Sequence, residues 1–331
     1  MSVKSSRFYE NNLSHKSYEG FSENIAFTGN YGHRGSVIMP IKTIKKAIRF
    51  VLNNIHFKKV NLQVTTLSPN ELLKGRTAYI TGGTSGIGYE IAYSFLKSGC
   101  NVIITGRTIE RVENACEALK QKEGISGSII GLVADSCQTE KFQSHLNSAL
   151  SKLKSHNISD QIDILVNNAG IVGGKLPLVT GADFDNIIYT NLKAPFFLSY
   201  IFADYMKQNH IKGNILNIGS SSSHRPAISA YTLSKWGVRA LTLGLAKSYA
   251  PYGITVNGLA PGPTSTPMLQ MENNSVRLNK AIPLGRYIMP EEIANMAVIL
   301  VSPLARAIIG DMVFMTGGVG NLTFDDYDYS L

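Results

Sequence analysis

The chain of 331 residues has few cysteines, a single tryptophan and a modest share of charged residues, 17%. Its three cysteines (Cys100, Cys116 and Cys137) are an odd number and lack the spacing of a zinc site. We therefore expect buried, reduced thiols in a cytoplasmic protein, with no disulfide framework and no metal. No apolar run reaches the ~18 residues that cross a bilayer, and the first residues lack the apolar segment of a secretory signal.

The positive charge is concentrated at the N-terminal end. Residues 1–70 contain ten Lys or Arg and three acids, a balance of +7, whereas the whole chain carries +9. The remaining residues, 71–331, therefore carry only +2. A nucleic-acid partner is not expected for this larger part, because its charge is nearly balanced.

Residues 1–70 are predicted to be a basic extension, and residues 71–331 a catalytic domain. The first 38 residues are rich in Ser, Asn, Gly and Tyr and lack periodicity, which indicates loop or disorder. From about 41 to 55, apolar residues share one helical face and lysines lie off it. This helix either packs on the body or on a second subunit, or makes peripheral contact with an anionic membrane surface.

From residue 75 onward, short β-branched runs alternate with longer amphipathic stretches. The runs are continuously apolar, as expected for strands that are covered on both faces. The alternation predicts a single α/β domain of Rossmann type, a doubly wound parallel sheet of seven strands with helices on both faces. The predicted strands are 77–81, 101–105, 128–134, 162–167, 213–219, 255–259 and 311–315.

A glycine-rich loop joins the first predicted strand to the helix that follows it. Glycines let a backbone approach a pyrophosphate, and a helix N-terminus offers unpaired N–H groups and a partial positive charge. This context predicts a dinucleotide site. Its residues are Gly82, Thr84, Ser85, Gly86, Ile87 and Gly88.

The end of the second predicted strand indicates which dinucleotide binds. Enzymes that prefer NAD commonly place an acid here, where it binds the ribose 2′-hydroxyl. This chain has Arg107 instead, whose planar cation suits a 2′-phosphate, and Thr84 and Ser85 can add hydroxyl donors. We therefore predict NADP(H) as the cofactor.

These motifs, with others that follow in order, resemble the short-chain dehydrogenase/reductase family, and among its members the 3-oxoacyl-(acyl-carrier-protein) reductases. The resemblance covers about residues 74–320. The matching positions are Thr81–Gly88, Asp135, Asn167–Gly170, Asn191, Ser220, Tyr231 with Lys235, Pro261–Thr266, and Gly310 with Thr316–Gly318.

The resemblance implies a role for each matching residue. Asp135 would contact the adenine, and Asn168, Ala169 and Gly170 would line the adenosine side. The backbone of Pro261, Gly262 and Thr264 and the hydroxyl of Thr266 would hold the carboxamide of the nicotinamide. The implied catalytic residues are Asn191, Ser220, Tyr231 and Lys235; Asn191 would hold a water that links Lys235 to solvent.

The spacing of Tyr231 and Lys235 supports these roles independently, because residues four apart share one face of a helix. A nearby ammonium and an oxidised nicotinamide should lower the pKa of the phenol from ~10 toward neutrality. Tyr231 would then give a proton to the carbonyl oxygen while NADPH delivers hydride to carbon. Ser220 would orient that oxygen.

The serine region departs from the family pattern. Tyr231 follows Ser220 by only eleven positions, an interval slightly shorter than is usual in the family. Ser221 or Ser222 is therefore an alternative to Ser220. His224 and Arg225 follow, and either lie solvated at the rim or contact an anionic or hydroxylated substrate.

The sequence leaves the substrate open. A 3-oxoacyl thioester or another ketone fits the resemblance. The loop 171–177, the segment 225–228 and the lid-like segment 267–283 are expected to select the substrate. The alternatives are a sugar-related dehydrogenase or epimerase in glycan assembly, and a non-catalytic NADP-binding regulatory or scaffold protein. The resemblance also implies a homodimer or homotetramer.

Overall fold

The computed structural model describes residues 45–46, 71–173, 179–269 and 278–322. The chain divides into two units, residues 1–59 and 60–331. Lys45 and Lys46 are helical and exposed. The rest of the predicted extension and of its amphipathic helix lies outside the described residues, so its membrane and packing alternatives stay predictions.

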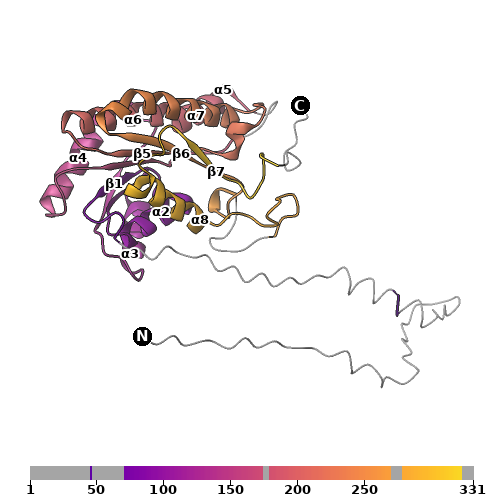
Figure 1. Ribbon diagram of the computed structural model, residues 1–331, viewed down its shortest axis with the longest axis horizontal. Coiled ribbons are helices and arrows are strands. Elements are labelled where there is room, and N and C mark those ends of the chain that lie inside the picture. The colour runs from indigo at the N-terminus through magenta and orange to yellow at the C-terminus, as the bar shows by residue number, and fades with distance from the viewer. Residues whose placement is uncertain (1–44, 47–70, 174–178, 270–277, 323–331) are drawn as a thin grey trace, which may run out of the picture. The chain divides into compact units, whose positions relative to one another are not determined.

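All seven predicted strands are present, in one parallel sheet with the order β3-β2-β1-β4-β5-β6-β7 (Figure 1). The chain starts at β1, builds outward to β3, and then returns to pair β4 with the other side of β1. Their bounds are β1 Thr77–Ile80, β2 Asn101–Gly106, β3 Ile129–Val133, β4 Ile164–Asn167, β5 Asn214–Ile218, β6 Thr255–Pro261 and β7 Met312–Met315.

The strands form because their side chains are buried on both faces. Every residue of β1, β4 and β5 is buried, as the continuous apolar runs predicted. Among the described residues the helices are α2 Gly86–Lys97, α3 Ile109–Lys120, α4 Phe142–Ser155, α5 Gly181–Ile188, α6 Ala194–Gln208, α7 Ala230–Tyr249 and α8 Pro290–Val301.

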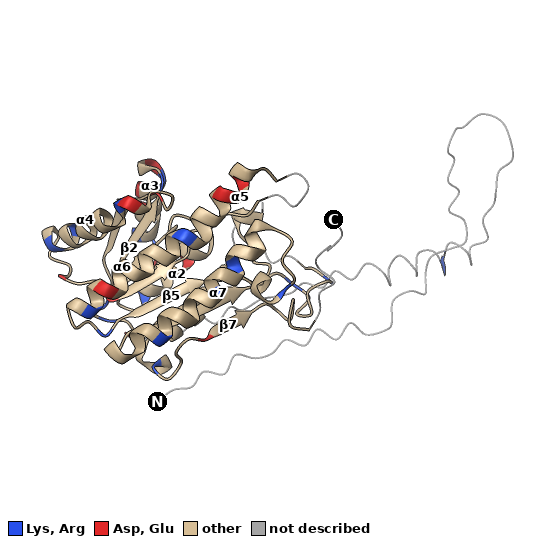
Figure 2. Ribbon diagram, turned by 90° about the horizontal axis from the view of Figure 1, so that it is seen from above, with Lys and Arg blue, Asp and Glu red and all other residues tan. Residues whose placement is uncertain are grey.

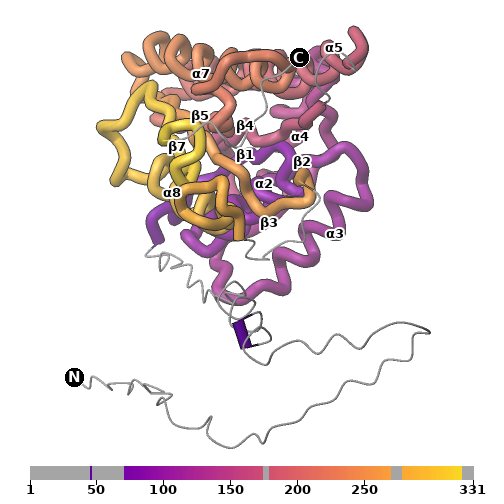
Figure 3. Tube along the Cα trace, turned by 90° about the vertical axis from the view of Figure 1, so that its right-hand side faces the viewer, coloured from indigo at the N-terminus to yellow at the C-terminus, as the bar shows by residue number. Residues whose placement is uncertain are grey.

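Two helical layers cover the sheet (Figures 1 and 3). On one face α2, α3 and α8 pack their apolar residues against the strands, and on the other α4, α6 and α7 do so. The two cores contain different sets of buried residues, one on each side of the sheet. The predicted three-layer Rossmann-type architecture is therefore confirmed.

Charges of both signs are interspersed over the helices of this domain (Figure 2), in keeping with its nearly balanced sequence charge. Within the described part of the chain, no helix is both long and apolar enough to cross a membrane. The same residues contain no cluster of His, Cys, Asp and Glu suited to a metal ion. The cytoplasmic location and the division at residue 70 stay predictions.

Candidate active site

A cavity of about 930 Å³ opens where the parallel strands end. Residues that follow β1, β2, β3, β4, β5 and β6 all line it, including Gly82, Arg107, Asp135, Asn168 and Ser220. The strand order reverses between β1 and β4, and ligands of open α/β sheets bind at such a switch point.

Nearly all of the residues predicted from the sequence line this cavity, and two do not. Gly88 and Asn191 act behind the surface, through contacts described below. The predicted residues that line it are Gly82, Thr84, Ser85, Gly86, Ile87, Arg107, Asp135, Asn168, Ala169, Gly170, Ser220, Tyr231, Lys235, Pro261, Gly262, Thr264 and Thr266.

Two glycines, Gly82 in the loop after β1 and Gly88 in the first turn of α2, are required by close packing. A Cβ on Gly88 would lie 2.3 Å from Nδ2 of Asn168 and 2.5 Å from the carbonyl oxygen of Gly82. Gly82 itself has φ of 63°, and a Cβ there would lie 2.9 Å from Cα of Ala169. Any side chain at Gly88 would push the loop away from β4, so this glycine shapes the cradle without lining it.

The helix N-terminus at the loop is free to receive an anion. Ser85, the N-cap of α2, makes no side-chain capping bond, and the first turn of α2 contains no acid. Gly86 and Ile87 in that turn line the cavity. The loop and helix therefore fit a pyrophosphate, because the terminal N–H groups and the helix dipole both favour negative charge.

Beside this cradle, two arginines line the cavity. Arg107 directly follows β2, and Arg111 lies four residues on, in the first turn of α3. The sequence reasoning missed Arg111, although its spacing from Arg107 was a usable signal. Asp135, after β3, accepts a hydrogen bond from the backbone N–H of Cys137 at 2.9 Å, which shapes the opposite wall.

Tyr231, Lys235 and Ser220 meet at the other end of the cavity. Tyr231 and Lys235 lie one turn apart on α7, with Nζ of Lys235 5.7 Å from the centre of the phenol ring. Nζ donates to the carbonyl oxygen of Ile218, the last residue of β5, at 2.9 Å, and this bond fixes the position of the amine. Ser220 hydrogen-bonds to Tyr231, and its Oγ accepts from the N–H of Ser222 at 3.1 Å.

Burial has the largest effect on the pKa of both ionisable groups. It raises the pKa of Tyr231, and the hydrogen bond from Ser220 lowers it by less. It lowers the pKa of Lys235 to about 8. In the chain without cofactor, burial therefore outweighs the effect of Ser220 on the phenol. The expected lowering of this pKa by Lys235 together with an oxidised nicotinamide concerns the complex with cofactor and stays a prediction.

Asn191 lies in a π-helical turn, Tyr189–Lys193, between α5 and α6. Its side-chain amide donates to the carbonyl oxygen of Ile171 and accepts from the N–H of the same residue, both at 2.8 Å. It also donates to Oγ of Ser234 at 3.2 Å. The side chain thus links the loop after β4 to α7. It also gives both the N–H and the carbonyl of Ile171 a hydrogen-bond partner, which backbone groups away from water require. The expected water link from Asn191 to Lys235 stays a prediction.

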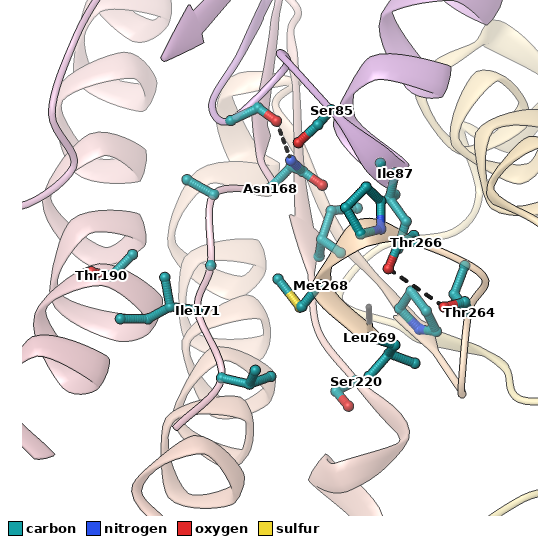
Figure 4. Close-up of a pocket in the computed structure, with 18 of the residues that line it drawn as sticks. Ser85, Ile87, Asn168, Ile171, Thr190, Ser220, Thr264, Thr266, Met268 and Leu269 are labelled. Carbon is teal, nitrogen blue, oxygen red and sulfur yellow. Dashed lines mark hydrogen bonds between the residues drawn. The ribbon is translucent and has the colours of Figure 1, made fainter. Parts of the chain in front are cut away.

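The loop after β6 forms one wall of the cavity (Figure 4). Oγ1 of Thr264 donates to the carbonyl of Gly262 at 2.9 Å, and Oγ1 of Thr266 donates to that of Thr264 at 3.4 Å. Figure 4 shows Met268 and Leu269 between this wall and the side formed by Ile171 and Thr190. They begin the predicted lid segment; Met271 and most of its neighbours lie outside the described residues.

Two expectations about single residues need correction. Cys137 is exposed and lines the cavity, whereas we expected all three thiols to be buried. It follows β3 at the edge of the sheet where the cavity lies, and its Sγ is 3.4 Å from Oγ1 of Thr190. Arg225 is only 4% exposed, so the rim-solvation alternative is wrong for it. His224 does not line the cavity and lies against Phe314, with ring centres 3.7 Å apart and ring planes inclined at 41°.

Comparison with known proteins places this site in a family. The family model described as short chain dehydrogenase matches residues 76–277, more than half of the chain. The chain belongs to the short-chain dehydrogenase family. The members of this family that resemble it confirm the similarity to 3-oxoacyl-(acyl-carrier-protein) reductases inferred from the motifs.

Three short-chain dehydrogenases illustrate the similarity. The 3-oxoacyl-(acyl-carrier-protein) reductase of Aquifex aeolicus is 34% identical over 253 residues, 75% of this chain and 98% of that protein. A gluconate 5-dehydrogenase described as putative from Beutenbergia cavernae, with bound NADP, is 30% identical with a TM-score of 0.64, over 74% of this chain and 97% of that one. The 3-ketoacyl-(acyl-carrier-protein) reductase of Brucella melitensis, complexed with NADH, is also 30% identical, with a TM-score of 0.65 over 74% and 98%.

Proposed function

We propose that the protein is an NADP(H)-dependent oxidoreductase that interconverts a carbonyl compound and a secondary alcohol, with Tyr231 as the general acid and base. One observation carries the proposal. The phosphate cradle after β1 and the group of Ser220, Tyr231 and Lys235 line the same cavity. A protein that only binds a dinucleotide would not need the second group beside the first.

Each residue of that group has a separate task in the proposed reaction. Tyr231 exchanges a proton with the substrate oxygen, and Ser220 orients that oxygen while it bonds to the phenol. Lys235 donates to the carbonyl of Ile218, with its amine 5.7 Å from the centre of the phenol ring. As the family resemblance implies, it would also bind the nicotinamide ribose of the cofactor. Bound NADPH would supply the hydride. Asn191 positions the loop after β4, which forms part of the cavity wall.

The preference for NADP(H) rests on the wall near β2. Arg107 and Arg111 both line the cavity there, and the sequence has no acid at the end of β2 to bind a ribose 2′-hydroxyl. Guanidinium groups bind phosphate oxygens through paired N–H donors. One similar structure contains NADP and another contains NADH, so these relatives do not favour either cofactor. The proposed preference for NADP(H) is therefore argued from this chain's own residues.

We also propose that the protein forms a homo-oligomer through α6 and α7. Phe196 and Tyr200 on α6, and Trp236 and Leu243 on α7, are each more than two-fifths exposed. Exposed apolar side chains gathered on one helical layer commonly mark an interface between subunits. Mass photometry of wild type and a Tyr200→Lys variant tests this: a monomeric wild type would refute it.

The reaction is tested by following NADPH and NADH oxidation over a panel of ketones, keto acids, sugars and 3-oxoacyl thioesters. The proposal predicts oxidation of NADPH that depends on the carbonyl compound, with kcat/KM at least tenfold higher than for NADH. Equal or higher efficiency with NADH would contradict the cofactor assignment. Epimerisation without net cofactor oxidation would favour the sugar-related alternative.

A further inference from the structure

The backbone of Ser220 is fixed by a neighbour in the turn that follows it. Ser220 is the N-cap of the short 3₁₀ turn Ser221–His224, which comes directly after β5. Its carbonyl oxygen accepts two hydrogen bonds from Ser223, one from the N–H at 3.0 Å and one from Oγ at 2.7 Å. Ser223 is completely buried. The position of Ser223 therefore determines the position of Ser220.

The hydrogen bonds inside this turn do not fix it relative to α7. Ser220 lies at the end of β5, whereas Tyr231 lies in the first turn of α7. Two groups that act on one substrate oxygen must each be held within about 0.5 Å of the productive geometry. A 3₁₀ turn has poorer hydrogen-bond geometry than an α-helix, so it needs support from outside itself. A contact between the turn and α7 would provide this support.

Arg239 makes such a contact. Tyr231, Lys235 and Arg239 follow one another at intervals of four residues along α7, so they share one face of the helix. Nη1 of Arg239 donates to the carbonyl oxygen of Ser223 at 3.2 Å. Hydrogen bonds thus lead from Arg239 to Ser223 and from Ser223 to Ser220, and they join α7 to the serine of the site.

Two aromatic rings hold the guanidinium of Arg239 in place. Its Cζ lies 5.7 Å from the centre of the Trp236 ring and 5.5 Å from that of Phe314, a residue of β7. Both distances are within the ~6 Å at which a cation is attracted to an aromatic face. Trp236 also donates from Nε1 to the carbonyl of Arg225, the residue that ends the turn, at 2.7 Å. Side chains of α7 therefore hold the turn at both Ser223 and Arg225.

We infer that Arg239 is a positioning residue of the proposed reaction, and that through Ser223 it keeps Ser220 at hydrogen-bonding distance from Tyr231. This inference rests on the proposed function and adds to it a residue outside the cavity. Arg239 does not line the cavity, so it is not placed to contact the cofactor or the substrate oxygen. Its loss should slow the reaction and leave cofactor binding unchanged.

The first test measures kcat and NADPH binding separately in variants of Arg239. The substrate is the carbonyl compound of the panel that the wild type reduces fastest with NADPH. In Arg239→Met we expect kcat to fall about tenfold, because a small displacement of an orienting group lowers the rate, and Kd for NADPH to stay within about twofold. Arg239→Lys keeps an N–H donor for Ser223 and should restore kcat to within about threefold of the wild type. Lys247→Met removes an exposed cation from the last turn of the same helix and should change neither value.

A double-mutant cycle with Ser220→Ala shows whether Arg239 acts through Ser220. Two residues that act through one contact have non-additive effects, whereas independent effects add in free energy. Adding Arg239→Met to Ser220→Ala should therefore lower kcat by less than about twofold. A general loss of structure would instead lower kcat about tenfold in both backgrounds. If Arg239→Met does not fold, Arg239→Gln replaces it in the cycle, because its shorter side chain removes the same contact.

The outcomes separate this inference from the proposed function. The inference is overturned by an unchanged kcat in Arg239→Met, by an equal loss of kcat in both backgrounds, or by no recovery in Arg239→Lys. Weakening of NADPH binding as large as the loss of kcat also overturns it. Each of these results leaves the proposed function intact. Failure of the wild type to oxidise NADPH with every carbonyl compound refutes the proposed function itself.

Discussion

The side-chain amide of Asn168 donates to the carbonyl oxygens of Thr81 at 2.9 Å and Gly82 at 3.0 Å, and so joins the end of β4 to the loop after β1. Figure 4 draws one of these two bonds as a dashed line. Gly88 packs against Nδ2 of Asn168 and against the carbonyl oxygen of Gly82, and leaves no room for a Cβ. Because the amide cannot move without losing both carbonyls, the cradle depends on a glycine at this position.

Replacing Gly88 by alanine should therefore disrupt cofactor binding. We expect Gly88→Ala to raise the Kd for NADPH by more than tenfold and to lower the free energy of unfolding by about 1–3 kcal/mol, the usual cost of overpacking. Gly244→Ala is the matched control, because nothing lies within 4 Å of its Cβ in the exposed middle of α7. That change should raise stability by about 0.5–1 kcal/mol. NADPH fluorescence titration and thermal unfolding measure both effects; unaltered NADPH binding in Gly88→Ala would contradict the account of the loop.

The contact between Ser220 and Tyr231 predicts which serine acts in the reaction. Ser220→Ala should lower kcat about 100-fold, because it removes a group that orients the substrate oxygen and lowers the pKa of the phenol. Ser222→Ala should change kcat by less than about threefold, because its N–H, not its side chain, supports Ser220. Steady-state kinetics of the two variants would show the reverse order if the shortened turn uses Ser222 instead.

Arg107 should determine the choice between the two nicotinamide cofactors. We expect Arg107→Ala to raise KM for NADPH by about tenfold or more, and to leave KM for NADH within about twofold, because only NADPH carries the 2′-phosphate. Lys120→Ala, at the exposed end of α3, controls for the loss of one positive charge. Equal changes for the two cofactors would exclude a role of Arg107 in recognising the 2′-phosphate.

Lys235 should reduce stability at neutral pH, because the fold buries its charge. Its pKa is about 8 in the folded chain and 10.5 ordinarily, a difference that corresponds to about 3 kcal/mol. Below about pH 8 the amine is protonated in both states, and the folded state bears the full cost. Between about pH 8 and 10.5 the unfolded state binds a proton that the folded state lacks, so stability rises with pH.

Lys235→Met removes this cost together with one hydrogen bond to Ile218, worth about 1 kcal/mol. We expect the inactive variant to be about 2 kcal/mol more stable than the wild type at pH 7, and this advantage to shrink steadily from pH 8 to pH 10. Denaturant unfolding without cofactor measures the difference at each pH. Lys207→Met, which changes an exposed cation, should show no such trend. A constant difference across this pH range would mean that the buried amine does not titrate there.

The sheet was predictable from the sequence because each strand is covered on both faces. A strand that is covered on both faces, such as β4, consists mostly of apolar residues, and its one polar residue, Asn167, is hydrogen-bonded to Ser199 and Asn217. The chain between two parallel strands must also be long enough for a crossover helix. The residues that follow the strand ends, such as Asn168 and Arg107, were predictable from the parallel arrangement of the strands. Parallel strands all end at one edge, so whatever follows them lines one cavity.

The contacts of single side chains could not be read in this way. Asn191 was identified by its motif, but its bonds to Ile171 and Ser234 depend on a π-helical turn that no local pattern announces. The backbone of Arg225 is held by a hydrogen bond from Nε1 of Trp236, eleven positions farther along on α7, a contact that no local pattern predicts. The pKa of Tyr231 depends on how deeply α7 is packed, a property of the whole fold.

The most direct test of the proposed function is the Tyr231→Phe variant on the best carbonyl substrate of the panel. It removes only the phenolic hydroxyl, so NADPH should bind with Kd within about threefold of the wild type. We predict that kcat falls by about 1,000-fold, in line with the loss of a general acid, while Tyr252→Phe, an exposed tyrosine outside the cavity, keeps the wild-type rate. Turnover by Tyr231→Phe at the wild-type rate would contradict the central claim.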